Sequence, residues 1–340
     1  MNFLLHLLIL FVLVTQVDAK TMTDFYDKPV IVPDKVDTVF GSSPPMNYLI
    51  YAINPDKMIG LNFNAKNPNN FATDEFLDKK FLALPVIGSF HGGGKSINLE
   101  TLIAKKPDLI LVWEDDMMIA TVHKAIEKSK LPTLSVPFRK IEDMPKAIKV
   151  VANAMDENDR GEILSSYANK VISEVKTAIK DTKPVRYYYA EGIDGLSTEC
   201  DKSFHVEAIN FAGGDNVHKC TQNGLLGLEK INAEKLLAYD PEVIIAQNSF
   251  AYNNILDDDI FSHLQAVKNN KVYLLPNTPF NWIDRPPSFM RILGIEWLAH
   301  IFHPNEYTLD LNKQIKEFYK LFLGVKITDA QIKTILGEKE

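Results

Sequence analysis

The chain has 340 residues and a formal charge of −7, with 37 Lys and Arg against 44 Asp and Glu. This length is enough for two domains with ordinary hydrophobic cores. A mildly acidic chain without a block of basic residues argues against a nucleic-acid-binding or anionic-membrane-binding surface.

The first nineteen residues, MNFLLHLLILFVLVTQVDA, contain an apolar run at 3–14 followed by the small-x-small sequence VDA. This pattern predicts a secretory signal peptide, residues 1–19, cleaved after Ala19. The apolar run is short for a membrane span, but an uncleaved anchor remains the alternative because no Lys or Arg precedes the run. We expect a periplasmic protein without stable membrane insertion.

Strand and helix signals alternate from residue 20 to residue 156. In the clearest unit, residues 97–104 have apolar positions at helical spacing, KKP ends the helix, and the apolar run 109–113 follows. A helix ended by proline and followed by a buried strand is typical of a parallel α/β sheet. The other signals lie at 37–40, 48–53, 58–61, 84–87, 117–128 and 133–136.

Residues 157–181 predict one long connecting helix. Apolar residues recur at helical intervals from Ile163 to Ile179, acidic residues lie near the start, and Lys183-Pro184 ends the helix. A helix of about 24 residues is roughly 36 Å long. We expect it to hold two lobes at a nearly fixed angle, with a shallow cleft between them.

The second half of the chain repeats a stretch of the first. NAEKLLAYDPEVIIA (232–246) matches NLETLIAKKPDLILV (98–112), with Asn, Glu, Leu, Ala, Pro and Ile in the same columns. In this second copy, residues 233–239 predict the helix, Pro241 ends it and residues 243–246 predict the strand. Further signals lie at 185–190, 203–211, 261–268 and 272–275. The sequence therefore predicts two Rossmann-like α/β lobes with mostly parallel sheets, residues 20–156 and 182–340, and a ligand cleft between them.

The chain has two cysteines, Cys200 and Cys220. An even number of cysteines in an exported chain suggests a disulfide. A pair of free thiolates that ligate a metal is the alternative.

Taken together, these residues resemble the substrate-binding proteins of ABC importers whose lobes are joined by one backbone helix. The family receives vitamin B12, ferric siderophores, haem and nickel or cobalt chelates. The resemblance covers nearly all of the mature chain, and its most specific stretches are INLETLIAKKPDLIL, GIDGLSTECDKSFHVEAINFAGGDNVH, INAEKLLAYDPEVII, HLQAVKNNKVYLLP and DRPPSFMRILGIEWLA.

The resemblance implies a monomeric receptor without intrinsic cofactor and without enzymatic activity. It would capture a metal chelate, with nickel and ferric complexes as the leading candidates and haem or a corrinoid as the alternative, and deliver it to a dimeric ABC permease. In such proteins each lobe offers an acidic residue to the permease. The matching columns here are Glu100 and Glu234, and two separated charged pairs would orient docking while leaving affinity modest.

Ligands of α/β sheets bind beyond the carboxyl ends of the strands. The loops there hold many aromatic residues, Phe138, Phe250 and Phe280 among them, which suit a bulky and partly apolar chelate. Arginines there suit an anionic chelate and acidic residues suit a cationic or neutral one, and the sequence does not choose between them. The expected ligand-binding residues are His91, Lys95, Trp113, Glu114, Arg139, Glu191, Tyr252, Trp282 and Arg285.

Among the histidines, His91 is the candidate for direct metal ligation, because the glycines of GSFHGGGK allow close approach. His205 fits a structural or rim position better. His300 and His303 are spaced i, i+3 on a terminal helix, away from the expected cleft. A bare-metal receptor needs three or four converging ligands, and the sequence shows no compact cluster of that kind.

Enzymatic readings are weaker. SFHGGGKS imitates a phosphate-binding loop, but Ser89 occupies the position of its first glycine. A periplasmic enzyme that processes metal chelates remains the alternative of another class, since fold does not dictate function. Such an enzyme needs an activated nucleophile or a redox centre, and the sequence indicates neither.

Overall fold

The computed structural model describes residues 19–64, 74–90, 96–114, 124–126, 130–220 and 227–337. Its strands are β1 Ala19–Thr23, β2 Pro29–Pro33, β3 Val39–Gly41, β4 Leu109–Trp113, β5 Thr133–Val136, β6 Val185–Ala190, β7 Ser197–Thr198, β8 Gly214–Asn216, β9 Glu229–Lys230, β10 Val243–Ala246 and β11 Val272–Leu274. Its helices are α1 Pro44–Ile53, α2 Lys79–Leu82, α3 Leu99–Lys105, α5 Met144–Ala154, α6 Asn158–Ile179, α7 Glu207–Phe211, α8 Ala233–Tyr239, α9 Ser249–Asp257, α10 Gln265–Lys268, α11 Arg291–Phe302, α12 Leu311–Phe318 and α13 Asp329–Leu336.

The N-terminal lobe is built on a parallel sheet with the strand order β3-β4-β5. Its central strand, LILVW, is buried along its whole length, as expected for a parallel strand covered on both faces. The C-terminal lobe has a second parallel sheet with the order β11-β10-β6-β8. In β6 the three consecutive tyrosines at 187–189 are fully buried, so this sheet is also covered on both faces.

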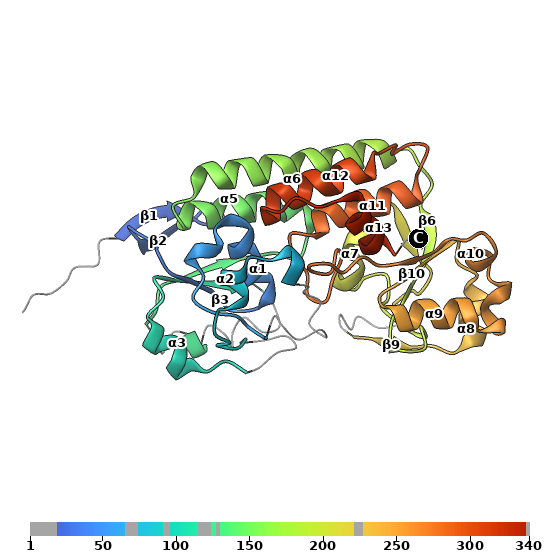
Figure 1. Cartoon of the computed structure of the whole chain (residues 1–340), viewed down its shortest axis with the longest axis horizontal. Coiled ribbons are helices and arrows are strands. Elements are labelled where there is room, and N and C mark those ends of the chain that lie inside the picture. Colours follow the sequence, from blue (N-terminus) through green and yellow to red (C-terminus); the bar gives the residue numbers. More distant parts are fainter. Residues whose placement is uncertain are drawn as a thin grey trace, which may run out of the picture.

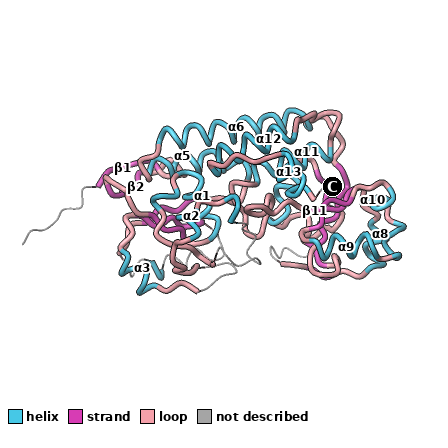
Figure 2. The backbone as a smooth tube through the Cα atoms, in the orientation of Figure 1, coloured by secondary structure: helices cyan, strands magenta, loops and turns pink. Residues whose placement is uncertain are grey.

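Helix α6 joins the two lobes. It runs above both of them in Figure 1 and Figure 2, with α5, α11 and α12 beside or beneath it. Gly161 lets α5 approach closely, because a Cβ at this position would lie 2.4 Å from the Cβ of Ala152. The predicted architecture, two α/β lobes joined by a single long helix, is confirmed.

The lobes also share a hydrophobic core. One continuous cluster of buried side chains runs from the N-terminal sheet through the helical layer to β6. Tyr48 of α1 stacks on Phe280 of the C-terminal lobe with ring centroids 3.9 Å apart. A shared core opposes large separation of the lobes, because their separation would expose apolar surface to water.

Several predicted segments have the expected boundaries: β4, β5, β6, α8 and β10 begin and end where the sequence placed them. The expected connecting helix at 157–181 is observed at Asn158–Ile179. Most of the predicted segment 117–128, and residues 1–18 of the predicted signal peptide, lie outside the described residues. In the part of the chain that is described, no helix is both long and apolar enough to cross a membrane.

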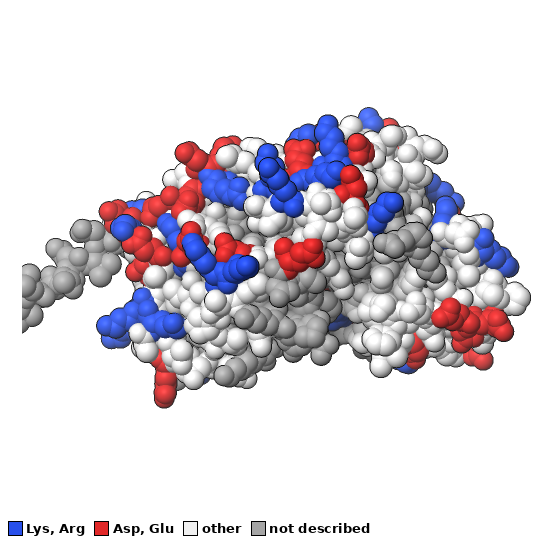
Figure 3. Space-filling model, viewed as in Figure 1, with Lys and Arg blue, Asp and Glu red and all other residues white. Residues whose placement is uncertain are grey.

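Charged side chains of both signs are interspersed on the face viewed in Figure 3, most densely over the helical layer around α5, α6 and α12. This face has no large patch of one sign. The distribution agrees with the mildly acidic composition.

Candidate ligand-binding site

The carboxyl ends of β6 and β10 lie side by side and place two polar side chains at one edge of the C-terminal sheet. Ala190 pairs with Ala246 in parallel register, so Glu191 and Gln247 follow at neighbouring positions. Gln247 Nε2 donates a hydrogen bond of 2.7 Å to Glu191 Oε1. Two backbone hydrogen bonds with Ser197, of 2.7 and 3.2 Å, hold the main chain of Glu191. Glu191 therefore has a defined position at the edge where ligands of parallel sheets bind.

Arg285 gathers three buried carboxylates around one guanidinium. Its Nε donates to Glu191 Oε1 at 2.7 Å, its Nη2 donates to Glu199 Oε1, and Asp284 Oδ2 lies 3.8 Å from Nε. Glu191, Glu199 and Asp284 have at most 1 % of their surface exposed. We call these four residues the carboxylate cluster.

One guanidinium does not satisfy three carboxylates. Glu191 Oε2, Glu199 Oε2 and Asp284 Oδ1 are buried and receive no hydrogen bond from any described residue. Burial raises the pKa of Glu191 to about 7, although the charge of Arg285 acts to lower it. A buried carboxylate without enough donors is costly, so Glu191 Oε2 is ready to accept a proton or a donor group of a ligand.

The cluster opens into a cavity with an apolar rim. The cavity has a volume of about 320 Å³, and both Glu191 and Arg285 line it. Three further lining side chains, Ile193, Leu228 and Phe250, are 79 %, 52 % and 67 % exposed. Exposed apolar side chains grouped around a buried polar centre are typical of a ligand site, where a partly apolar molecule covers the rim.

Phe204 connects this cluster to the N-terminal lobe. Its ring lies 6.4 Å from the ring of Trp113, and the guanidinium carbon of Arg139 lies 5.0 Å from its centroid, a cation–π contact. On its other side, Phe204 packs against His205 at 3.8 Å, and His205 Nδ1 is paired with Asp284. The predicted residues Trp113 and Arg139 therefore contact the C-terminal lobe through Phe204.

Other predicted site residues have different positions. Trp282, predicted to bind the ligand, is fully buried in the core and donates its indole N–H to Thr278 O at 3.1 Å, so its ring is not accessible to a ligand in this structure. Tyr252 is half-buried on α9 and packs against the core of its own lobe. Glu114 lies at the carboxyl end of β4, as expected for a cleft residue. His91, the expected metal ligand, and Lys95 lie outside the described residues.

The other expected aromatics divide in the same way. Phe250 is exposed at the rim of the cavity, whereas Phe138 and Phe280 are fully buried. Phe280 stacks on Tyr48 and so joins the lobes. Apolar loop residues thus serve the core as well as the cleft.

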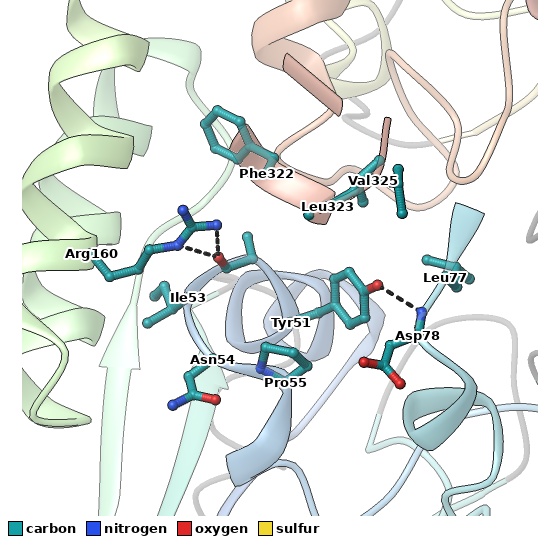
Figure 4. A pocket seen from close by; sticks show the side chains of 12 residues that line it. Tyr51, Ile53, Asn54, Pro55, Leu77, Asp78, Arg160, Phe322, Leu323 and Val325 are labelled. Carbon is teal, nitrogen blue, oxygen red and sulfur yellow. Dashed lines mark hydrogen bonds between the residues drawn. The ribbon is translucent and has the colours of Figure 1, made fainter. Parts of the chain in front are cut away.

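A second cavity, of about 400 Å³, lies beside the C-terminal end of α1 (Figure 4). Arg160 enters it from α6, but its Nε and Nη2 donate to the carbonyl oxygen of Ala52 at 3.1 and 3.0 Å, and Nη2 also donates to Leu321 O. The hydroxyl of Tyr51 accepts the backbone N–H of Asp78 at 3.1 Å. Arg160 and Tyr51 are thus already bonded to neighbouring backbone groups, and none of the described residues that line this cavity has a buried side-chain oxygen without a partner.

Comparison with known proteins agrees with this architecture. A family model described as periplasmic binding protein matches residues 86–279. The chain belongs to the periplasmic binding protein family. The predicted resemblance to substrate-binding proteins of ABC importers is therefore confirmed.

Relatives of this periplasmic binding protein have different ligands. The structure of an ABC transporter solute-binding protein from Sulfurospirillum deleyianum is similar with a TM-score of 0.87 and 38 % identity, over 93 % of this chain and 99 % of that one. The molybdate-binding protein MolA of Haemophilus influenzae is 26 % identical, over 89 % of this chain and 90 % of its own length. A vitamin B12-binding protein of Vibrio parahaemolyticus is 24 % identical, over 77 % of this chain and 88 % of its own length. An oxyanion and a corrinoid differ so much that family membership does not specify the ligand.

The two helices with the matching glutamates have the same local structure. α3 and α8 each contain seven residues, and each begins after an asparagine, Asn98 or Asn232, whose side chain accepts a backbone N–H of the first turn at 2.9 Å. Glu100 and Glu234 occupy the same position in the first turn and are exposed. In Figure 1 the two helices lie at the outer parts of the two lobes, away from α6.

Cys200 and Cys220 form a disulfide. Around it, Asp201 N–H donates to His218 O and the carboxylate of Asp201 accepts Cys220 N–H, both at 2.9 Å. The bridge therefore holds the segment that carries Glu199.

Glu199, Phe204 and Asp284 are not among the ligand-binding residues predicted from the sequence. Glu199 directly precedes Cys200, and Asp284 directly precedes Arg285. Their positions next to a predicted disulfide and a predicted ligand-binding arginine were the available signals.

Proposed function

We propose that this periplasmic binding protein is the exported receptor of an ABC importer and that it captures a metal complex in the cleft between its lobes. A nickel or ferric chelate is the leading ligand. The observation that supports this proposal most strongly is the carboxylate cluster, with its unsatisfied oxygens, at the base of an open cavity with an apolar rim.

The arrangement suits reversible binding. A polar centre selects and orients the ligand, and apolar side chains around it contribute most of the buried area. The shared core and α6 favour small lobe movements, so we expect a largely preformed site. Delivery would use Glu100 and Glu234, one on each lobe, to orient the receptor on a permease dimer.

Calorimetric titration of the purified mature protein tests the function. Ni(II)–histidine, ferric citrate, haem and cobalamin are the ligands, and we expect saturable binding of at least one of them with the complex recovered unchanged. Chemical conversion of the bound complex would contradict a receptor function, as would the absence of binding throughout the set.

A matched pair of variants on α9 tests the position of the site. Phe250→Ala removes an aromatic ring from the cavity rim and should weaken binding about tenfold, the effect of losing roughly 1.4 kcal/mol. Leu256→Ala removes an exposed apolar side chain of the same helix that does not line the cavity, and it should bind normally. Equal effects of the two variants would place the ligand elsewhere.

A further inference from the structure

Arg285 is poorly available to an anionic ligand. Its Nε and Nη2 already donate to Glu191 and Glu199, and a third carboxylate, Asp284, lies within 4 Å, at 3.8 Å. The guanidinium carries one positive charge against three carboxylates. A bound oxyanion would have to compete with these carboxylates for donors, and it would add negative charge to a cluster that already has an excess of it.

Glu191, by contrast, has a carboxylate oxygen that can accept a hydrogen bond from a ligand. Its Oε1 is bonded to Arg285 and Gln247, while its Oε2 is buried and has no donor among the described residues. Glu191 also lines the cavity. A ligand in the cavity can therefore supply the missing donor without displacing an existing hydrogen bond.

The N-terminal lobe also presents a carboxylate with an unsatisfied oxygen. Arg139 holds its guanidinium over the ring of Phe204. Glu114, at the carboxyl end of β4, has an Oε2 that is buried and accepts no hydrogen bond from the described part of the chain. Both sheets thus present a carboxylate with an unsatisfied oxygen at their ligand-binding edge.

From these contacts we infer that the cleft selects a positively charged metal complex, one that directs N–H or O–H donors of its chelator toward Glu191, and that it rejects oxyanions. This inference rests on the receptor function proposed above and narrows its ligand class. It also distinguishes this chain from its relative named for molybdate. Glu191 is the specificity-determining residue. Glu199 acts through Arg285 by occupying its Nη2, and Asp284 adds a negative charge 3.8 Å from Nε.

Two inert cobalt(III) complexes of similar size and opposite charge test the inference. Tris(ethylenediamine)cobalt(III) is a cation that directs amine N–H groups outward, and tris(oxalato)cobaltate(III) is an anion that directs oxygens outward. Each is titrated into the mature protein at pH 8 by calorimetry, with molybdate as a third probe. We expect the cation to bind at least tenfold more tightly than either anion.

The variants Glu191→Gln and Glu234→Gln complete the design. Glu191→Gln keeps the shape of the side chain and removes its charge, so it should weaken binding of the cation at least tenfold. Glu234→Gln is the control, since this exposed glutamate lies on α8 and does not line the cavity. Circular dichroism and thermal unfolding establish that both variants are folded.

Should Glu191→Gln not fold, the same question is answered with the wild-type protein by comparing the three probes alone. Tighter binding of an anion, no response to the cation, or an unchanged cation affinity in folded Glu191→Gln would each overturn the inference. The receptor function would survive these results if a complex of the calorimetric set still bound reversibly, so the two proposals fail separately.

Discussion

Replacing Glu191 by glutamine should stabilise the ligand-free protein at pH 8, although the substitution removes an ion pair with Arg285. The pKa of Glu191 is raised from 4.5 to about 7, because burial and the nearby carboxylates of Glu199 and Asp284 penalise the charged form more than Arg285 favours it. Desolvation thus outweighs the ion pair at this position.

The direction of the change in stability with pH follows from the number of protons bound by the folded and the unfolded state. The folded state holds this proton up to about pH 7, whereas the unfolded chain loses it near pH 4.5. The folded state therefore binds more protons between these values, and the free energy of unfolding falls as the pH rises through this window. Each pKa unit corresponds to about 1.4 kcal/mol, so the loss in wild type is about 3 kcal/mol. Glutamine does not titrate, so the free energy of unfolding of Glu191→Gln does not fall in this way as the pH rises.

Urea unfolding of the two ligand-free proteins between pH 4 and pH 8, with the disulfide intact, measures the effect. We expect the stability of Glu191→Gln relative to wild type to increase by about 3 kcal/mol across this range. Glu234→Gln, which replaces an exposed glutamate, should show no comparable change. If Glu191→Gln becomes less stable than wild type at pH 8, the ion pair with Arg285 dominates and the reasoning is refuted.

Three further predictions concern other parts of the molecule. Burial raises the pKa of Glu296 on α11 to about 8. Glu296→Gln should therefore be more stable than wild type at pH 9, by about 5 kcal/mol at most. Urea unfolding should show that this gain in stability disappears near pH 4.5, and a gain independent of pH would contradict the prediction. The double variant Glu100→Ala, Glu234→Ala should have unchanged ligand affinity in calorimetry but lower uptake. The decrease is up to about 30-fold if each exposed ion pair with the permease contributes about 1 kcal/mol. Normal uptake would disprove the docking role. Cys200→Ser with Cys220→Ser should lower the free energy of unfolding by about 3 kcal/mol through loss of the closed loop, and an unchanged urea midpoint would show that the bridge contributes little.

The local elements were predictable because their signals are local. The apolar runs 109–113 and 243–246, each preceded by a helix and a proline, have the same bounds as β4 and β10. A buried parallel strand needs only a short run of apolar residues. The strand-end rule then placed Glu191 and Arg285 among the candidate ligand-binding residues.

Burial of individual loop residues was not predictable in this way. Trp282 and Phe250 both lie in segments that follow a strand of the C-terminal sheet, yet Trp282 is fully buried and Phe250 is 67 % exposed. The difference comes from packing: Gly294 of α11 lies so close to Trp282 that a Cβ there would be 2.1 Å from its carbonyl oxygen. The sequence shows that a residue is apolar. Whether its side chain is buried or exposed depends on which helix packs against it in the folded structure.

The sequence by itself determined the two-lobed α/β fold, the connecting helix and the strand ends near which we expect the site, because hydrophobic periodicity and proline stops act within a few residues. It left open whether the cleft favours an anion or a cation. The tertiary structure decided that Nε and Nη2 of Arg285 donate to carboxylates 94 and 86 residues away along the chain. The charge of the site depends on contacts between side chains that are far apart in the sequence. Local sequence patterns do not predict such contacts.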